Sequence, residues 1–294
     1  MLKDVVARQL IRHQQVIEGI MPKHTIIPMR LGTFAQDEAE VRDILNKGYR
    51  IIKDIFAKIG DKIEIDVACT WSDFNSVLKE VGEGKEIKEF KERVLANPKG
   101  ITVEDQMKIG VMVKKALDEK RERYALQIQN TLKTASCDCK RHELMDDKMV
   151  INCAFLIEKA KCEDFDRKIE ELNSNFAEKL NFRCVGPLPP YSFYTLEVKK
   201  MDFKEIDWAR KRLGLNDIAN KDEIKKAHQR LAFSLHPDKN PDTPDIEREF
   251  DNATRAYKIL LDYAQAFEQT AQFDKYSFKE EEFKKNAILV KVRQ

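Results

Sequence analysis

The sequence predicts an α+β protein whose front part mixes helices with strands and whose last third is almost wholly helical. Apolar residues recur at helical spacing over residues 37–59, 221–235 and 246–266, and they alternate with polar ones over residues 63–69, as in a half-buried strand. Three prolines within residues 187–190 forbid a helix, so this stretch must run extended and separates the two parts.

The composition sets limits on the class of protein. A chain of 294 residues is long enough for two or three domains, and 42% hydrophobic with 35% charged residues is typical of a globular, helix-rich protein. The net charge of +2 forms no basic stripe, which argues against a nucleic-acid partner. No apolar run approaches the ~18 residues of a membrane span. Charges interrupt residues 1–20, unlike a signal peptide, so we expect a cytoplasmic protein without a membrane partner.

The front part contains strand, helix and strand in succession. Residues 149–157 predict a strong strand, residues 162–180 a helix and residues 181–185 a second strand, which together make half of a ferredoxin-like unit. A similar half is expected over residues 25–69, after a helix at residues 1–20. The expected fold is therefore ferredoxin-like α/β units with a long helical insertion.

The helical insertion fills the space between these units. We expect short helices over residues 72–99 and a long helix from Thr102 to about residue 135, where Thr102 and Asp105 form a cap pair. Residues 137–147 are expected to be a loop. The predicted domains are residues 1–71, 72–147, 148–200, 203–270 and 271–294.

Three segments of the front part carry a family pattern. Residues 27–34 read IPMRLGTF, residues 152–157 read NCAFLI, and residues 182–193 read FRCVGPLPPYSF. In this order they resemble the gas vesicle protein GvpL/GvpF family over about residues 4–198. The family's leading strand has no counterpart, so the first unit is expected to be shortened at its start. The residues that carry the pattern, expected to be structural, are Arg30, Gly32, Thr33, Gly186, Pro187, Pro190, Tyr191 and Phe193.

This resemblance implies an accessory protein in gas vesicle assembly. Members of the family look like non-catalytic binders of the vesicle shell protein and of other vesicle accessory proteins. The proline-rich stretch at residues 186–193 is interpreted as a rigid corner in which Tyr191 and Phe193 cap the core, with direct contact to a partner as the alternative.

The last third predicts an antiparallel helix hairpin. Asn220 caps a helix over residues 221–235 with Glu223 at its third position, and another helix follows at residues 246–266. A shorter helix over residues 207–215 precedes them. The connection between the two long helices, residues 236–241, reads HPDKNP.

This arrangement resembles a J-domain. Residues 223–232, EIKKAHQRLA, and residues 236–240, HPDKN, match the family's second helix and loop, and the HPD tripeptide is intact. The resemblance implies binding to a DnaK-type chaperone and stimulation of its ATPase. The basic side chains suit an acidic partner surface, and the alternative is a solvated helix with an inert loop. The expected chaperone-binding residues are His236, Pro237, Asp238, Lys225, Lys226, Arg230 and Lys239.

Two features remain less specific. His228 stands where many J-domains have tyrosine, which would weaken packing or partner contact; a ligand role for it is disfavoured. After a charged stretch, residues 287–292 are mostly apolar, and we expect a strand added to the sheet of the front part or an ordered terminus, with an exposed partner-binding segment as the alternative.

No pattern in the sequence supports catalysis, a metal or a cofactor. Cys137, Cys139 and His142 lack the fourth ligand of a structural zinc site, and Gly82-Glu83-Gly84 lacks the lysine of a phosphate loop. The six cysteines are scattered and are expected to be free thiols.

The function that these observations favour is gas vesicle assembly with built-in recruitment of a DnaK-type chaperone. We expect a non-catalytic protein that is cytoplasmic and associated with the vesicle. The alternatives are a general J-domain co-chaperone with unrelated clients and a structural vesicle component whose J-domain is vestigial.

Overall fold

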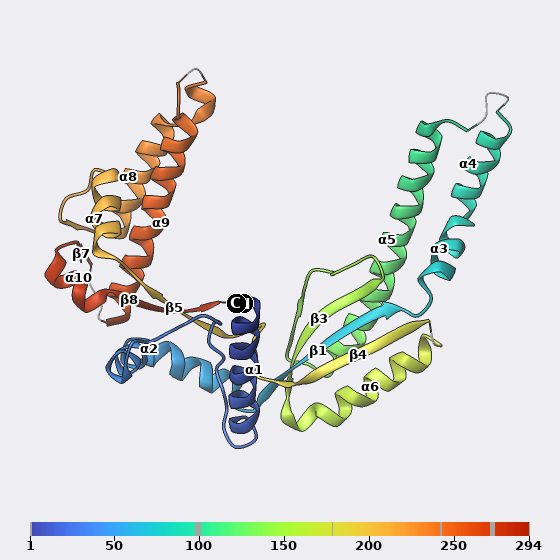
Figure 1. Cartoon of the computed structure of the whole chain (residues 1–294), viewed down its shortest axis with the longest axis horizontal. Coiled ribbons are helices and arrows are strands. Elements are labelled where there is room, and N and C mark those ends of the chain that lie inside the picture. Colours follow the sequence, from blue (N-terminus) through green and yellow to red (C-terminus); the bar gives the residue numbers. More distant parts are fainter. Residues whose placement is uncertain (1, 98–100, 178, 242, 271–273, 294) are drawn as a thin grey trace. The chain divides into compact units, whose positions relative to one another are not determined.

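A computed structural model describes residues 2–97, 101–177, 179–241, 243–270 and 274–293. The chain forms two compact units (Figure 1). The first unit comprises Met1–Ile26 and Ile59–Phe193, and the second comprises Ile27–Lys58 and Tyr194–Gln294. Each unit is therefore made of two segments of the chain, and in the sequence these two segments lie on either side of a segment of the other unit.

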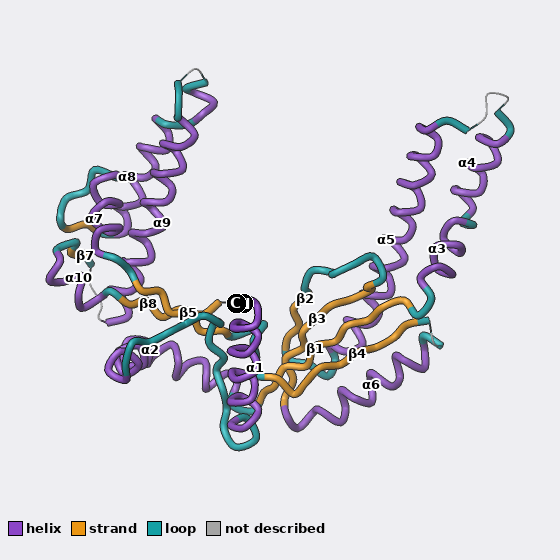
Figure 2. The backbone as a smooth tube through the Cα atoms, in the orientation of Figure 1, coloured by secondary structure: helices purple, strands orange, loops and turns teal. Residues whose placement is uncertain are grey.

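The first unit is built on a four-stranded antiparallel sheet (Figure 2). Its strands are β1 (Lys62–Trp71), β2 (Asp138–Arg141), β3 (Met149–Glu158) and β4 (Leu180–Leu188), in the spatial order β2-β3-β1-β4. β1 lies between β3 and β4, with Val67 opposite both Cys153 and Cys184. The alternating apolar residues of β1 thus face one core.

Helices complete the core of the first unit. α5 (Val103–Lys133) and α6 (Cys162–Asn175) bury Ile128, Leu132 and Phe165 in the same cluster as Ile65 and Val67 of β1. α3 (Phe74–Gly82) and α4 (Lys85–Leu95) continue from β1 to α5. In α1 (Leu2–Ile20), Ile17 is buried.

The second unit contains a small sheet with a helix packed on it. β5 (Thr195–Lys200) pairs antiparallel with β8 (Ile288–Arg293), and Met29 forms a parallel bridge to Leu196 of β5. α2 (Glu38–Ile59) packs on β8 at Gly48, where a Cβ atom would lie 2.9 Å from Val290 Cγ1. A glycine is needed there because the helix backbone approaches the strand so closely.

The helical module lies between β5 and β8 in the chain. It consists of α7 (Phe203–Arg212), α8 (Lys221–Ser234), α9 (Ile246–Thr270) and α10 (Glu280–Asn286), with a short pair of strands, β6 (Ile218–Ala219) and β7 (Tyr276–Ser277). Its core joins the three longer helices to the segment after α9. The buried residues include Ile206, Ile224, Leu260, Tyr263, Tyr276, Phe278 and Phe283.

Most predicted elements are present, and the fold class is confirmed as α+β followed by a helical module. The capping boxes at Thr102 and Asn220 are both formed. The tail strand exists as β8, but it pairs with β5 in a separate two-stranded sheet and not with the four-stranded sheet of the first unit. The loop predicted over residues 137–147 is wrong in part, because residues 138–141 form β2.

The strand predicted at residues 25–31 is also wrong, since this segment has a single bridge, at Met29, and none to β1. The helix predicted from residue 207 begins earlier, at Phe203. None of the helices among the described residues is long and apolar enough to cross a membrane.

Candidate functional site: the HPD loop and the basic side of α8

α8 begins at a reciprocal cap that sets the direction of the helix. The Asn220 side chain accepts from the Glu223 N–H, and the Glu223 carboxylate accepts from the Asn220 N–H, each at 2.8 Å. Ile224 and Ala227 then face the core shared with α9. The opposite side of α8 is left to solvent, and α8 ends directly before the HPD loop.

The HPD loop is a short 3-10 turn at Pro237–Lys239 held by local hydrogen bonds. The Asp238 N–H donates to His236 Nδ1 at 3.2 Å, so a neutral imidazole carries its proton on Nε2. Asn240 Nδ2 donates to the carbonyls of Ser234 and His236, at 2.8 and 3.0 Å. These bonds fix the loop backbone against the end of α8.

The side chains of the loop remain available to a partner. The His236 ring stands edge-on to Phe250 of α9 with 5.8 Å between ring centroids, and the Asp238 side chain is 87% exposed. Phe233 is 69% exposed, and Lys239 Nζ lies 2.9 Å from its ring centroid. The loop therefore presents an imidazole, a carboxylate and a cation-capped aromatic ring on one exposed end of the hairpin.

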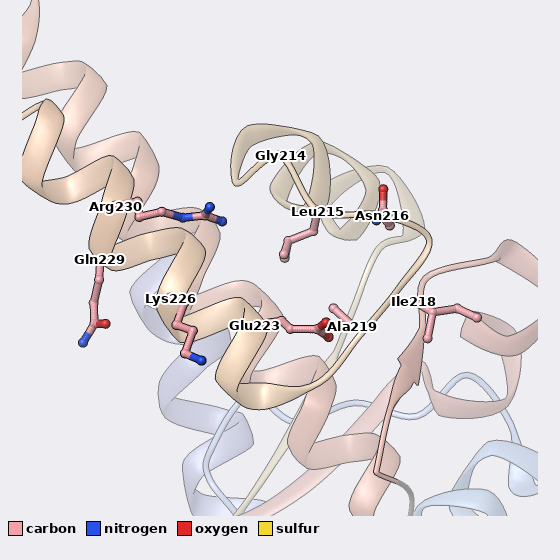
Figure 3. Close-up of a pocket in the computed structure, with 9 residues that line it drawn as sticks. All are labelled: Gly214, Leu215, Asn216, Ile218, Ala219, Glu223, Lys226, Gln229 and Arg230. Carbon is pink, nitrogen blue, oxygen red and sulfur yellow. The ribbon is translucent and has the colours of Figure 1, made fainter.

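The predicted basic residues lie on two sides of α8. Lys226 and Arg230, four residues apart, line a cavity of about 440 Å³ that the loop from Gly214 to Ala219 closes on its other side (Figure 3). Lys225 is exposed but lies about 100° around the helix from Lys226 and does not line this cavity. The ion pairs of the described residues include none of Lys225, Lys226, Arg230 and Lys239. Lys225, Lys226 and Arg230 thus carry no ion pair that would compete with an acidic surface, whereas Lys239 lies on the Phe233 ring.

His228 has a packing role. Its ring stacks on Tyr257 of α9 at 4.3 Å with 8° between the planes, and its buried Nε2 has no hydrogen-bond partner. Burial lowers the pKa of His228, so the neutral ring is favoured. The imidazole contributes an aromatic face to the contact between α8 and α9; whether it packs less tightly there than a tyrosine stays a prediction.

Three of the residues that carry the family pattern, Arg30, Gly32 and Thr33, lie in the second unit. The Arg30 N–H donates to the Leu196 carbonyl at 2.8 Å, and its guanidinium pairs with Glu197. Gly32 has φ +87°, a conformation that favours glycine, and Thr33 Oγ1 donates to the Arg30 carbonyl at 2.7 Å. These residues make the turn after the segment that lies beside β5.

The second group forms the proline corner of the first unit, residues 186–193. A Cβ on Gly186 would lie 3.0 Å from the Glu64 carbonyl, so β4 approaches β1 closely there. Tyr191 is partly buried and Phe193 is buried. Pro187 is joined to Gly186 by a cis peptide bond and lies in β4, whereas Pro190 accepts a backbone hydrogen bond from the Phe193 N–H at 3.2 Å. The two groups therefore belong to different units.

Sequence reasoning missed the residues that hold this corner. Ser192 binds Glu64 of β1 through both its N–H and its hydroxyl, each at 2.8 Å, and Glu64 is 1% exposed. The alternating pattern of β1 placed Glu64 on the solvent side of a half-buried strand. A carboxylate opposite a proline-rich segment gives no signal in a single sequence that would have reversed this assignment.

Two residues of the possible metal motif, Cys139 and His142, contact different side chains. Cys139 Sγ accepts from Gln129 Nε2 at 3.0 Å, whereas His142 Nε2 lies 3.1 Å from Ser192 Oγ. Within the described ranges no group of three or more His, Cys, Asp or Glu side chains is placed to hold a metal ion.

Comparison with known proteins decides the family. The family model described as gas vesicle synthesis protein GvpL/GvpF matches residues 2–195. The chain belongs to this family. Gas vesicle protein F of Microcystis aeruginosa is 22% identical over 192 residues, which are 64% of this chain and 78% of that protein. Gas vesicle protein F of a Nostoc species is 23% identical over 189 residues, 63% of this chain and 77% of that protein.

Solved structures of GvpL/GvpF members share the fold. GvpF from an Anabaena species gives a TM-score of 0.57 at 24% identity over 63% of this chain and 76% of that one. GvpF from Microcystis aeruginosa gives 0.53 at 22% identity over 63% of this chain and 77% of that one.

The helical module carries a DnaJ domain, whose model matches residues 211–266. The chaperone protein DnaJ of Cupriavidus taiwanensis is 42% identical over 77 residues, 26% of this chain and 18% of that protein. The matched residues end before Tyr276, Phe278 and Phe283, which nevertheless lie in the core of the module. Proteins of both families are typically non-catalytic.

Proposed function

We propose that this GvpL/GvpF member assists gas vesicle assembly by bringing a DnaK-type chaperone to the vesicle proteins that it binds. One observation carries the proposal: an HPD loop with an exposed aspartate and unpaired neighbouring cations stands in the same chain as the family's own fold. The roles of His236, Pro237 and Asp238 with Lys225, Lys226, Arg230 and Lys239 are to contact the chaperone. The partners on the vesicle side are the shell protein and other accessory proteins.

The way the J-domain is attached supports this proposal. The chain enters the module from β5 and leaves it into β8, and these two strands pair over six residues, from Thr195 opposite Arg293 to Lys200 opposite Ile288. Gln269 of α9 exchanges two hydrogen bonds with the backbone of Val290. Both ends of the module therefore continue into paired strands of one sheet, and the module is not attached through a single linker.

Part of the structure that holds the helical module comes from the GvpL/GvpF region. Lys200 of β5 pairs with Glu40 of α2 at 2.6 Å, and Lys199 pairs with Asp262 of α9 at 2.5 Å. α2 and the segment at Met29 lie within the residues that match the family. A chaperone bound at the HPD loop would thus be held at a fixed place relative to this segment.

The physical need for such recruitment lies in the client. A small apolar shell subunit exposes surface that aggregates before assembly, and chaperone action at the site of growth would limit this. The proposed place of action is the cytoplasm, on or beside the growing vesicle.

A single-turnover ATPase assay with the cognate DnaK-type chaperone tests the J-domain role. We expect the chain to accelerate hydrolysis and His236→Gln to lose the acceleration, whereas the matched control His24→Gln, at an exposed histidine of the first unit, keeps it. Equal stimulation by wild type and His236→Gln would contradict the proposal and favour a structural protein with a vestigial J-domain.

A pull-down with the purified shell protein and with the other vesicle accessory proteins tests the vesicle side. Retention of at least one of them by both wild type and His236→Gln is expected, because the HPD loop lies outside the family region. Retention of none, together with intact ATPase stimulation, would point to a general co-chaperone with unrelated clients.

A further inference from the structure

The hairpin of α4 and α5 exposes five large apolar side chains at the end where α4 stops and α5 starts. Figure 1 shows the two helices side by side, extending away from the strands of the first unit. The exposed fractions are 68% for Leu95, 47% for Ile101, 70% for Val103, 62% for Met107 and 69% for Val111. Single exposed apolar residues are common on any protein, whereas a group of them at one end of a hairpin indicates an interaction surface.

Three of these side chains form a row along α5, which we call the apolar ridge. Val103, Met107 and Val111 are four residues apart, so they follow one another along the same side of the helix. Gly110 borders this row, and a Cβ atom on it would meet nothing within 4 Å. The ridge is therefore open over more than two turns of the helix.

The opposite side of α5 is already used inside the hairpin. Met112, Val113 and Ala116 pack against the core of the first unit, to which Ile87 of α4 also belongs. At 100° per residue, these three side chains lie on the far side of the helix from the ridge. The first half of α5 is thus apolar on two opposite sides. Because a helix that is apolar all round is normally buried, the uncovered ridge indicates a partner.

The charges beside the ridge are largely balanced by one another. Lys108 pairs with Glu104 at 2.8 Å, and Lys115 lies 3.9 Å from Glu119. Lys114, at the inner end of the ridge, adds a single positive charge. This surface therefore differs from the basic side of α8, and its partner is recognised by apolar side chains and not by opposite charge.

The area of the surface decides between a second copy of the chain and a smaller partner. A side chain of this size carries ~100 Å² of apolar area when fully exposed, so the five together offer on the order of 300 Å². A stable dimer buries ~800 Å² on each partner, so this surface alone would not hold a second copy. Such an area suits short-lived binding of one apolar segment.

The structure of α5 also limits the form of the bound segment. The backbone of α5 is paired within the helix, so the segment has to bind through side chains. A helix whose apolar residues are four apart interlocks with a ridge of the same spacing. Met107, in the middle of the ridge, is flexible enough to follow different side chains.

We propose that the apolar ridge of α5, together with Leu95 and Ile101, holds an apolar helical segment of an unassembled vesicle shell subunit. This inference rests on the function proposed above, in which the shell protein is one of the partners. Short-lived binding fits that role, because a subunit that is protected from aggregation must afterwards be released to the growing vesicle.

A binding titration of a dye-labelled shell subunit with the full chain tests the ridge. The double change Met107→Gln with Val111→Gln removes two of its three apolar side chains and should weaken binding at least about tenfold. Both residues are exposed, so the unfolding midpoint reported by Trp71 should stay unchanged. The matched control Leu126→Gln, at an exposed apolar residue further along α5, should bind as wild type does. Equal binding by the double variant and wild type would overturn the proposal.

The two proposals fail in different ways in this titration. If wild type and the double variant bind the shell subunit equally well, the ridge is refuted and the proposed function stands. If wild type binds no shell subunit, the shell protein is not a partner, and both that part of the proposed function and this inference are wrong. His236→Gln should bind the subunit as wild type does, because the HPD loop lies in the other unit.

Photo-crosslinking and sedimentation give independent measurements. A benzophenone amino acid in place of Met107 should crosslink to the shell subunit, whereas the same amino acid in place of Leu126 should not. Equal crosslinking from the two positions would contradict the proposal. A concentration-dependent dimer of the full chain that the double variant abolishes would also overturn it, in favour of a second copy on the ridge.

Discussion

Replacing Phe283 by alanine tests whether residues beyond the matched DnaJ domain belong to the core of the helical module. Phe283 is 7% exposed, and its ring lies 5.5 Å from that of Phe203 and 6.0 Å from that of Tyr263. Truncating a buried phenylalanine costs about 3–5 kcal/mol. We expect about 3 kcal/mol, the lower end, because α10 is a short helix that can move into the space left behind. With an m-value of about 1.5 kcal/mol/M, the urea midpoint of the second unit should fall by about 2 M.

The two tryptophans of the chain allow this unit to be followed alone. Trp71 lies in the first unit and Trp208 in α7 of the second, so a Trp71→Phe background leaves one fluorescence reporter for the helical module. Phe233→Ala is the matched control, because its ring is 69% exposed and its loss should change stability by less than about 0.5 kcal/mol. A midpoint for Phe283→Ala within about 0.5 M of the background would refute the reasoning.

Three further changes probe single contacts. Because the pKa of His228 is lowered by burial, the second unit should lose stability as the pH falls below about 6.5, and His228→Phe should flatten this profile in urea unfolding at pH 5 and 7.5. Asn220→Ala removes the cap of α8 and should cost about 1 kcal/mol in the same assay, without changing the slope with urea. Gly186→Ala brings a methyl group to 3.0 Å from the Glu64 carbonyl and should destabilise the first unit by about 1–3 kcal/mol; equal stability would show that β4 can move away.

The helix hairpin of the second unit could be predicted because its signals are local. Caps at Asn220 and apolar residues at helical spacing define α8 without reference to the rest of the chain. The HPD loop follows directly, so its position required no tertiary information. The roles of its residues in chaperone binding remain predictions.

The features that were missed depend on long-range pairing. β2, residues 138–141, is a polar edge strand whose four residues show no apolar alternation, so only its partner β3 reveals it. The segment at Met29 was expected to be a strand of the same half unit as residues 63–69, but it forms a single bridge to β5, which depends on contacts between distant parts of the sequence. Glu64 is buried because Ser192, far away in sequence, covers it. Sequence periodicity reports which face of a strand is apolar and says nothing of what later segments lie over the other face.

The pairing of β5 with β8 also fixes an order of events during synthesis. β5 leaves the ribosome before the J-domain, and β8 leaves after it, so the helix hairpin and the HPD loop can form while their mount is still open. The aromatic residues before β8 then complete the core of the helical module, and β8 itself pairs with β5. Until β8 has been made, the J-domain of a nascent chain is therefore joined to β5 alone and lacks the strand that pairs with β5 in the complete chain.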